Sequence, residues 1–436
     1  MKNKVVAVIC TVMLTGAMVA GCGSQAATET AASAASAASS AAEAAEQVVE
    51  SETAEAAVAA SSEVVVAAST ESVVSASAEE IDPAVAECAA LIDAIYVQER
   101  TEETDAQCEA AKAAWDALTD EQKAQVEGKE ADPDYFGRDT GDASLDDTLN
   151  ADEIGENEIL VVSFGTSFND SRVKDISSIE KAIAAAYPDW SVRRAFTAQI
   201  IINHVQAREG AKIDNMEQAM DRAVANGVKN LVIQPTHLMQ GAEYDELMEV
   251  VEQYNDKIDS ITVAEPLLGE VGEDATVINE DKAAVAEAVV GAAVESAGFE
   301  SAAAAADENV AFVLMGHGTS HIAKVTYSQM QTQMNELGYS NVFIGTVEGE
   351  PEETACENVI EAVKDAGFTK VILRPLMVVA GDHANNDMAG EDEDSWKSMF
   401  EASGAFESVD AQIEGLGRIE AVQNLYIAHT AAAIGE

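Results

Sequence analysis

From residue 158 onward, the chain alternates short, continuous apolar runs with longer segments whose apolar residues recur every three or four positions. The first run is Ile159-Leu160-Val161-Val162, and such runs are typical of strands covered on both faces of a parallel sheet. The pattern predicts strands at 159–163, 191–196, 230–234, 260–263 and 309–315, with helices at 173–187, 197–208, 215–226 and 244–254. Strands that alternate with helices indicate an α/β fold with a doubly wound parallel sheet.

The pattern occurs twice along the chain. The segment 227–235 matches 367–375, and the register continues without a gap, so that 241–243 falls on 381–383. We therefore predict two duplicated α/β lobes with a cleft between them. The lobes lie at 158–275 and 308–436, and a connecting helix and linker lie at 276–307.

The residues before the first lobe differ from it in composition and in the spacing of their apolar residues. Asp82-Pro83 resembles a helix N-cap followed by proline at the first helical position. It opens a predicted helical module at 81–130, and an acidic linker follows at 131–157. Residues 22–80 are mostly Ala, Ser, Glu, Thr and Val without one aromatic residue. Such a composition cannot bury a core, so we predict a low-complexity tether.

The N-terminus has the features of an export signal. Lys2 and Lys4 precede an apolar run at 5–20, and Val19-Ala20-Gly21-Cys22 resembles a bacterial lipobox. We predict a signal peptide at 1–21, lipidation of Cys22 and an extracytoplasmic lipoprotein attached to the membrane only through its lipid. An ordinary signal peptide with an incidental cysteine is the alternative. The apolar run is shorter than the ~20 residues that a spanning helix needs.

Charge and cysteine content narrow the function classes. The chain has 79 acidic and 24 basic residues, a formal net charge of −55, which excludes nucleic acid as a partner because such a surface repels phosphates. No Cys-x-x-Cys motif occurs, so a thiolate zinc site is not expected. Cys88 and Cys108 fall on neighbouring predicted helices. This placement is compatible with either of two alternatives, a disulfide between the two cysteines or two buried free thiols.

Ionisable residues gather in the loops that follow the predicted strands, where open parallel sheets bind their ligands. His317 lies between two glycines directly after a strand, and Phe164 takes its place in the first lobe. Glu243 and His383 occupy equivalent positions of the two lobes, and Glu348 follows the strand at 342–344. The alternative roles are structural: a turn-bonded histidine, a helix-capping cluster and a surface acid.

From residue 159 to the C-terminus, the sequence resembles the sirohydrochlorin cobaltochelatases of anaerobic cobalamin biosynthesis. These are class II chelatases with a duplicated α/β fold akin to that of ferrochelatase. The most specific match is 379–388, which ends in Asn386-Asp387-Met388. The other matching motifs lie at 160–167, 194–197, 315–318, 347–348, 375–377 and 394–397.

The resemblance implies that His317, Glu243 and His383 are catalytic and that His317, Glu348 and His383 bind the metal. Insertion requires a divalent cation beside two pyrrole protons that must leave, and neutral imidazole and carboxylate serve as ligand and base. Co²⁺ would be a substrate and not a permanent cofactor, and Fe²⁺ or Ni²⁺ would suit the same ligands.

The expected macrocycle carries many carboxylates, so local positive charge should offset the acidity of the protein. The candidate residues are all arginines: Arg193, Arg194, Arg208, Arg374 and Arg418.

Export leaves other functions open. A tetrapyrrole- or metal-binding lipoprotein without turnover, working with a transporter, is one alternative. A generic two-lobed solute-binding lipoprotein is another, but it does not explain why ionisable residues converge on strand-end loops.

Overall fold

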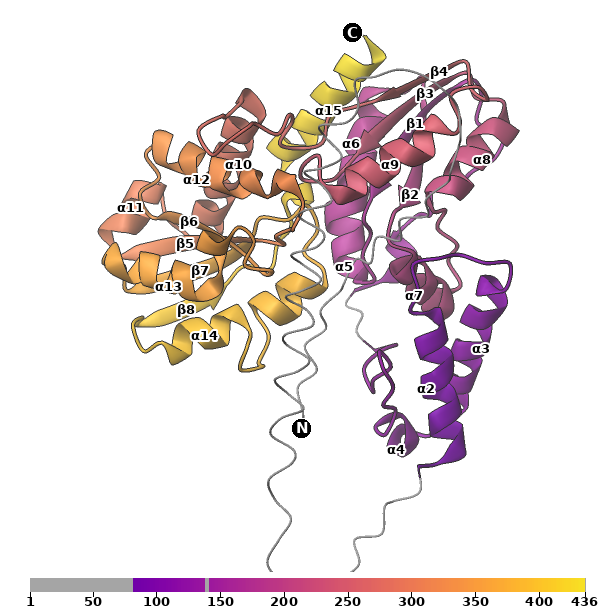
Figure 1. The fold of residues 1–436 in the computed structure, drawn as a ribbon, viewed down its shortest axis with the longest axis horizontal. Helices are drawn as coiled ribbons and strands as arrows, with labels where there is room; N and C mark the ends of the chain where they lie inside the picture. The colour runs from indigo at the N-terminus through magenta and orange to yellow at the C-terminus, as the bar shows by residue number, and fades with distance from the viewer. Residues whose placement is uncertain (1–80, 138–140, 436) are drawn as a thin grey trace, which may run out of the picture. The chain divides into compact units, whose positions relative to one another are not determined.

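The computed structural model describes residues 81–137 and 141–435 (Figure 1). The predicted signal peptide at 1–21, the lipidation site Cys22 and the tether at 22–80 lie outside these described residues. Within them, no helix has the length and apolar character needed to cross a membrane.

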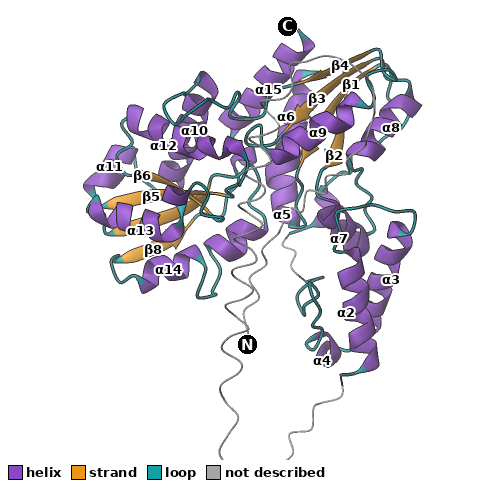
Figure 2. Ribbon diagram, viewed as in Figure 1, coloured by secondary structure: helices purple, strands orange, loops and turns teal. Residues whose placement is uncertain are grey.

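Two parallel sheets of four strands form the two lobes (Figure 2). The strand order of the first sheet is β2-β1-β3-β4, with bounds β1 (Asn157–Ser163), β2 (Ser191–Phe196), β3 (Asn230–Pro235) and β4 (Ser260–Val263). The second sheet repeats it as β6-β5-β7-β8, with bounds β5 (Val310–Gly316), β6 (Val342–Thr346), β7 (Lys370–Pro375) and β8 (Ser408–Ala411). The predicted fold class, α/β with two duplicated parallel-sheet lobes, is confirmed.

Helices connect the strands of both lobes. The first lobe contains α5 (Asn169–Ser171), the π-helical turn η2 (Arg172–Ile176), α6 (Ser177–Ala186), α7 (Gln199–Glu209), α8 (Met216–Asn226) and α9 (Ala242–Glu252). The remaining elements are α10 (Glu280–Ser296), α11 (Ala302–Asp307), η3 (Ile322–Lys324), α12 (Val325–Glu336), η4 (Glu352–Thr354), α13 (Cys356–Asp365), η5 (Ala384–Met388), α14 (Trp396–Ala402), η6 (Leu416–Arg418) and α15 (Glu420–Ile434).

The C-terminal helix α15 joins the two lobes. It follows β8 of the second lobe but packs against α6 and β3 of the first. The Tyr426 hydroxyl donates to the carbonyl of Thr236 at 2.9 Å, and the Tyr187 hydroxyl donates to the carbonyl of Ile427 at 3.0 Å. One apolar cluster contains Ile159 of β1 and Phe312 of β5. The lobes therefore share part of their core.

The N-terminal module packs on helix α7 of the first lobe. It comprises α2 (Pro83–Ile95), α3 (Thr104–Ala117) and α4 (Asp120–Lys123), and Figure 1 shows α2 and α3 beside α7. The side chain of Asn203 on α7 donates to the carbonyl of Ile95 at 2.9 Å. His204 stacks on Tyr135 with ring centroids 4.3 Å apart and is 8% exposed. The module therefore covers the face of α7 that carries His204.

The predicted acidic linker is attached to the first lobe by Asp146. Its carboxylate accepts hydrogen bonds from Arg172 Nε at 2.7 Å, Arg194 Nη1 at 2.8 Å and Ser177 Oγ at 2.8 Å. Burial opposes ionisation, but the hydrogen bond and charge of Arg194 and the charge of Arg172 outweigh it and lower the pKa of Asp146 to about 2. This carboxylate is therefore ionised and fixed at neutral pH.

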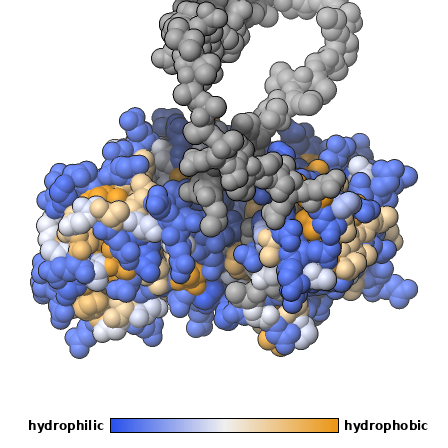
Figure 3. All heavy atoms as spheres, turned by 90° about the horizontal axis from the view of Figure 1, so that it is seen from below, coloured by the Kyte–Doolittle hydropathy of each residue, from blue (hydrophilic) through white to orange (hydrophobic). Residues whose placement is uncertain are grey.

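Hydrophilic residues dominate the face of the molecule drawn in Figure 3, with small, separate apolar patches between them. This agrees with the large acidic excess of the sequence.

Cys88 and Cys108 are buried free thiols, so the disulfide alternative is wrong. The Cys108 thiol lies 3.5 Å from the carbonyl oxygen of Asn203 and donates to it, which directs the sulfur toward α7. Burial raises the pKa of Cys88 and raises that of Cys108 to about 11.

We therefore expect neither thiol to react with a maleimide in the native protein, because each is buried and protonated. After unfolding without a reductant, both should react fully, and peptide mapping would identify each labelled cysteine. Labelling that requires prior reduction would show that the two sulfurs are bridged.

Candidate active site

The loop that carries His317 is shaped by the two glycines beside it. A Cβ on Gly316 would lie 2.3 Å from a ring carbon of Tyr327, and a Cβ on Gly318 would lie 2.9 Å from the Cβ of Glu348. Gly318 also has a φ of +91°, a conformation that other residues rarely adopt. The Gly-His-Gly sequence therefore lets the His317 loop approach Tyr327 and Glu348 closely.

Hydrogen bonds orient the His317 ring and its loop. The Nδ1 of His317 lies 2.8 Å from the carbonyl oxygen of Gly318, and the amide of Gly318 donates to the Tyr327 hydroxyl at 3.1 Å. A carbonyl oxygen can only accept, so Nδ1 carries the proton and Nε2 keeps its lone pair. His317 can therefore act as a metal ligand through Nε2.

His383 is oriented in the same way and lies beside His317. Its Nδ1 donates to Asp387 Oδ2 at 2.6 Å, which leaves Nε2 available, and the centroids of the two imidazole rings are 4.6 Å apart. Burial acts to lower the pKa of His383, but the bond to Asp387 and the negative charges of Asp387, Asp382 and Glu348 outweigh it and raise the pKa. The structure thus brings His317 and His383 together and puts Glu348 within electrostatic reach.

Glu243 comes from the other lobe, in the first turn of α9. Its negative charge acts on Tyr327, whose hydroxyl supports the His317 loop. Burial and this charge raise the pKa of Tyr327 to about 12, so the phenol stays protonated. His321 Nε2 also lies 3.3 Å from Asp245 Oδ2, which joins α9 to the segment after His317. These contacts link the Glu243 helix to the His317 loop across the two lobes.

His237 was not among the predicted site residues. It lies two residues after Pro235, where β3 ends, and among the described residues neither ring nitrogen has a hydrogen-bond partner, although both are buried. Burial lowers its pKa, opposed by the charge of Glu243. Its place at a strand end was the sequence signal that could have identified it.

The described residues contain no group of three or more His, Cys, Asp and Glu side chains arranged to hold a metal ion. The assignment of His317, Glu348 and His383 as metal ligands, and of His317, Glu243 and His383 as catalytic residues, therefore stays a prediction.

The sequence profile of the cobalt chelatase (CbiK) family matches residues 157–435. The chain belongs to this family. The sirohydrochlorin cobaltochelatase of Salmonella typhimurium is 33% identical over 276 residues, which are 63% of this chain and 96% of that protein. The sirohydrochlorin cobaltochelatase CbiKC of Nitratidesulfovibrio vulgaris is 29% identical over 278 residues, which are 63% of this chain and 90% of that protein.

Among solved structures, SirB from Bacillus subtilis with Fe³⁺ is 16% identical. The match has a TM-score of 0.42 and covers 64% of this chain and 96% of that one.

The arginines expected to offset the charge of the substrate are used inside this chelatase instead. Arg193, Arg194 and Arg374 are at most 1% exposed, so the expectation is wrong for them. All five pair with carboxylates of the chain: Arg193 with Glu158, Arg194 with Glu180 and Asp146, Arg208 with Glu209, Arg374 with Glu414, and Arg418 with Asp175. An arginine next to a strand motif can pair either with a buried carboxylate of the protein or with an acidic ligand. The sequence alone does not distinguish these two roles.

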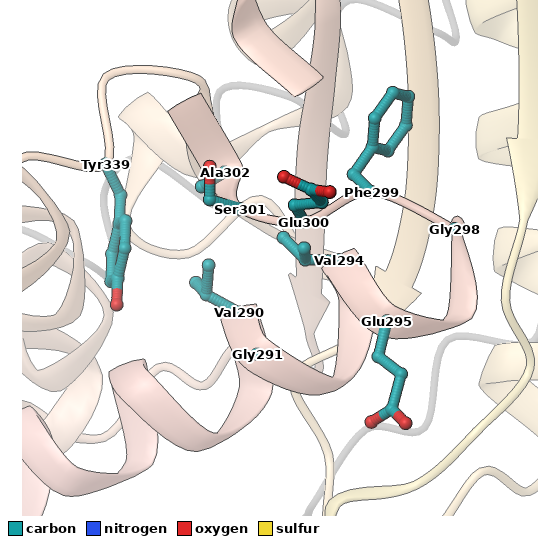
Figure 4. A pocket seen from close by; sticks show the side chains of 10 residues that line it. All are labelled: Val290, Gly291, Val294, Glu295, Gly298, Phe299, Glu300, Ser301, Ala302 and Tyr339. Carbon is teal, nitrogen blue, oxygen red and sulfur yellow. The ribbon is translucent and has the colours of Figure 1, made fainter. Parts of the chain in front are cut away.

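A pocket of about 500 Å³ lies in the segment that connects the two lobes, between the end of α10 and the start of α11 (Figure 4). Val290, Val294 and Tyr339 are among the residues that line it. None of the predicted site residues does, so we do not assign this pocket to the active site.

The Asp387→Asn substitution should lower the pKa of His383, because it removes the negative charge and the acceptor that stabilise the imidazolium. NMR titration of the ring protons measures the change. A protonated imidazole cannot bind metal, so the pH below which metal binding is lost should fall together with the pKa of His383. Asp394→Asn, which removes an exposed charge that is not one of the main causes of the His383 pKa shift, is the matched control. An equal His383 pKa in both variants would contradict the assignment.

Proposed function

We propose that the chain catalyses the insertion of Co²⁺ into sirohydrochlorin. Membership of the cobalt chelatase family supports this, and the single observation that carries the residue assignment is the pair of imidazoles whose ring centroids lie 4.6 Å apart. Both rings have Nδ1 engaged in a hydrogen bond, so Nε2 is the nitrogen through which each ring would bind a cation.

In the proposed reaction, Co²⁺ binds to Nε2 of His317 and His383, with Glu348 as a further ligand. Two pyrrole N–H protons must leave as the four macrocycle nitrogens take the metal. Glu243, a carboxylate brought from the other lobe, accepts one of these protons, and an imidazole released by the metal can accept the other. The proton count balances because the cation replaces two protons.

Purified protein mixed with sirohydrochlorin and Co²⁺ should accelerate the change of macrocycle absorbance that accompanies insertion. His317→Ala should reduce the rate about 100-fold or more, as expected when a ligand and proton acceptor is lost. His429→Ala is the matched control, because His429 bonds to Glu265 and Asp281 away from the predicted site.

Wild-type rates in both His317→Ala and His383→Ala would refute the site. Binding of the macrocycle without metallation by the wild-type protein would instead support a binding protein without turnover.

We further propose that the chelatase is exported and held at the membrane through a lipid on Cys22. The support is the sequence Val19-Ala20-Gly21-Cys22 after an apolar run. An extracytoplasmic chelatase would need its macrocycle delivered across the membrane, so a transporter is the kind of partner that this proposal implies.

In cells, Cys22→Ser should release the protein from the membrane fraction while the insertion rate of the purified protein stays unchanged. Fractionation followed by immunoblotting measures the release, and Cys356→Ser, which removes a buried thiol of α13, controls for the loss of a cysteine. Retention of the Cys22→Ser protein in the membrane fraction would refute the anchor.

A further inference from the structure

The loop that leads to His383 is held by the opposite lobe at Ala380. The amide of Ala380 donates to Asp175 Oδ2 at 3.0 Å, and the Ser171 hydroxyl donates to the carbonyl oxygen of Ala380. Both polar groups of this one peptide position are therefore bonded to the first lobe, only three residues before His383.

Asp175 also holds a second segment of the second lobe, at 415–418. Its Oδ1 accepts from Arg418 Nε at 2.7 Å, and its side chain is 0% exposed. The segment packs so closely that a Cβ on Gly415 would lie 2.5 Å from Asp175 Oδ2, and one on Gly417 would lie 2.4 Å from the Asp175 carbonyl oxygen. The amide of Gly417 donates to the carbonyl of Val378, which joins this segment to the His383 loop. The buried Asp175 carboxylate thus fixes both the loop that leads to His383 and the segment 415–418.

Asp175 lies in the π-helical turn η2, and the acidic linker at 131–157 braces this turn through Asp146. Asp146 bonds to Arg172, the first residue of η2, and to Ser177, the residue that follows it. Residue 146 lies before the family match at 157–435. The brace is therefore supplied by a part of the chain that the family profile does not include.

We propose that Asp175 is a positioning residue that sets the place of His383 relative to His317, and that Asp146 supports it by holding both ends of η2. This inference rests on the proposed function for its kinetic test, although the contacts that carry it lie outside the catalytic residues. A displacement of about 1 Å can cost about 100-fold in rate, so small shifts of the Ala380 peptide matter at His383.

The test compares Asp175→Asn with Asp170→Asn in the full chain. Asn keeps the size of the side chain but not the charge that Arg418 requires. Asp170 of α5 instead pairs with the exposed Lys174 of η2. We expect kcat for Co²⁺ insertion to fall about 10- to 100-fold in Asp175→Asn, with KM for the macrocycle changed less than about 3-fold. Asp170→Asn should retain the wild-type kcat.

A second pair tests the brace. Asp146→Asn should lower kcat about 3- to 10-fold by loosening η2, in the range of one weakened charged hydrogen bond. Asp147→Asn, which removes the neighbouring exposed carboxylate, should not lower kcat.

A spectroscopic readout tests the positioning role directly. The visible spectrum of Co²⁺ added alone should change in Asp175→Asn, because the geometry of the two imidazoles changes. A purely structural role of Asp175 would leave this spectrum unchanged.

The outcomes separate this inference from the proposed function. If the wild-type protein does not metallate the macrocycle, the proposed function fails, and the Co²⁺ spectrum still tests the positioning role. A folded Asp175→Asn variant with wild-type kcat and an unchanged Co²⁺ spectrum overturns the inference. If Asp175→Asn does not fold, Ser171→Ala and Asp146→Asn carry the test with the same readouts.

Discussion

The site depends on the pairing of strands β5 and β7 within one sheet. In this pairing Met315 lies opposite Pro375, so the chain leaves the sheet at neighbouring points before it reaches His317 and the loop to His383. Neighbouring strands of a sheet lie about 4.8 Å apart, close to the 4.6 Å between the two imidazole centroids. The sheet thus brings the starts of the two loops together. From there the glycines beside His317 and the hydrogen bonds of the Ala380 peptide hold the loops that carry the two rings.

Buried ion pairs hold the surrounding structure, and they explain where the few cations of a strongly acidic chain are used. Arg194 is fully buried between Glu180 and Asp146, and Arg193 pairs with the buried Glu158. An isolated buried charge is very unfavourable, so removing either partner of such a pair is strongly destabilising. These arginines are consequently committed to the fold. The positive charge available to a substrate must come from elsewhere, including the bound metal and any protonated imidazole.

Strands, duplication and the place of the site could be predicted because each leaves a local pattern in the sequence. Continuous apolar runs predict β1 and β5. Because ligands bind at the ends of parallel strands, the sequence also predicts that His317 and His383 lie close together, and their ring centroids are 4.6 Å apart. The roles of Arg193 and His204 could not be predicted, because both depend on partners far away in the chain. Likewise, helical spacing places Cys88 and Cys108 on packed faces but does not determine the distance between their sulfur atoms.

The two lobes have kept their topology and diverged in chemistry at equivalent positions. Phe164 stands where His317 stands in the second lobe, and Glu243 where His383 stands. The second lobe therefore provides both imidazoles, while the first provides a carboxylate and, through Asp175, the contact that holds the His383 loop. In the proposed reaction, the base and the metal ligands come from different lobes, so a macrocycle would meet a proton acceptor and a cation from different sides. The contact between the lobes would then be part of the catalytic geometry.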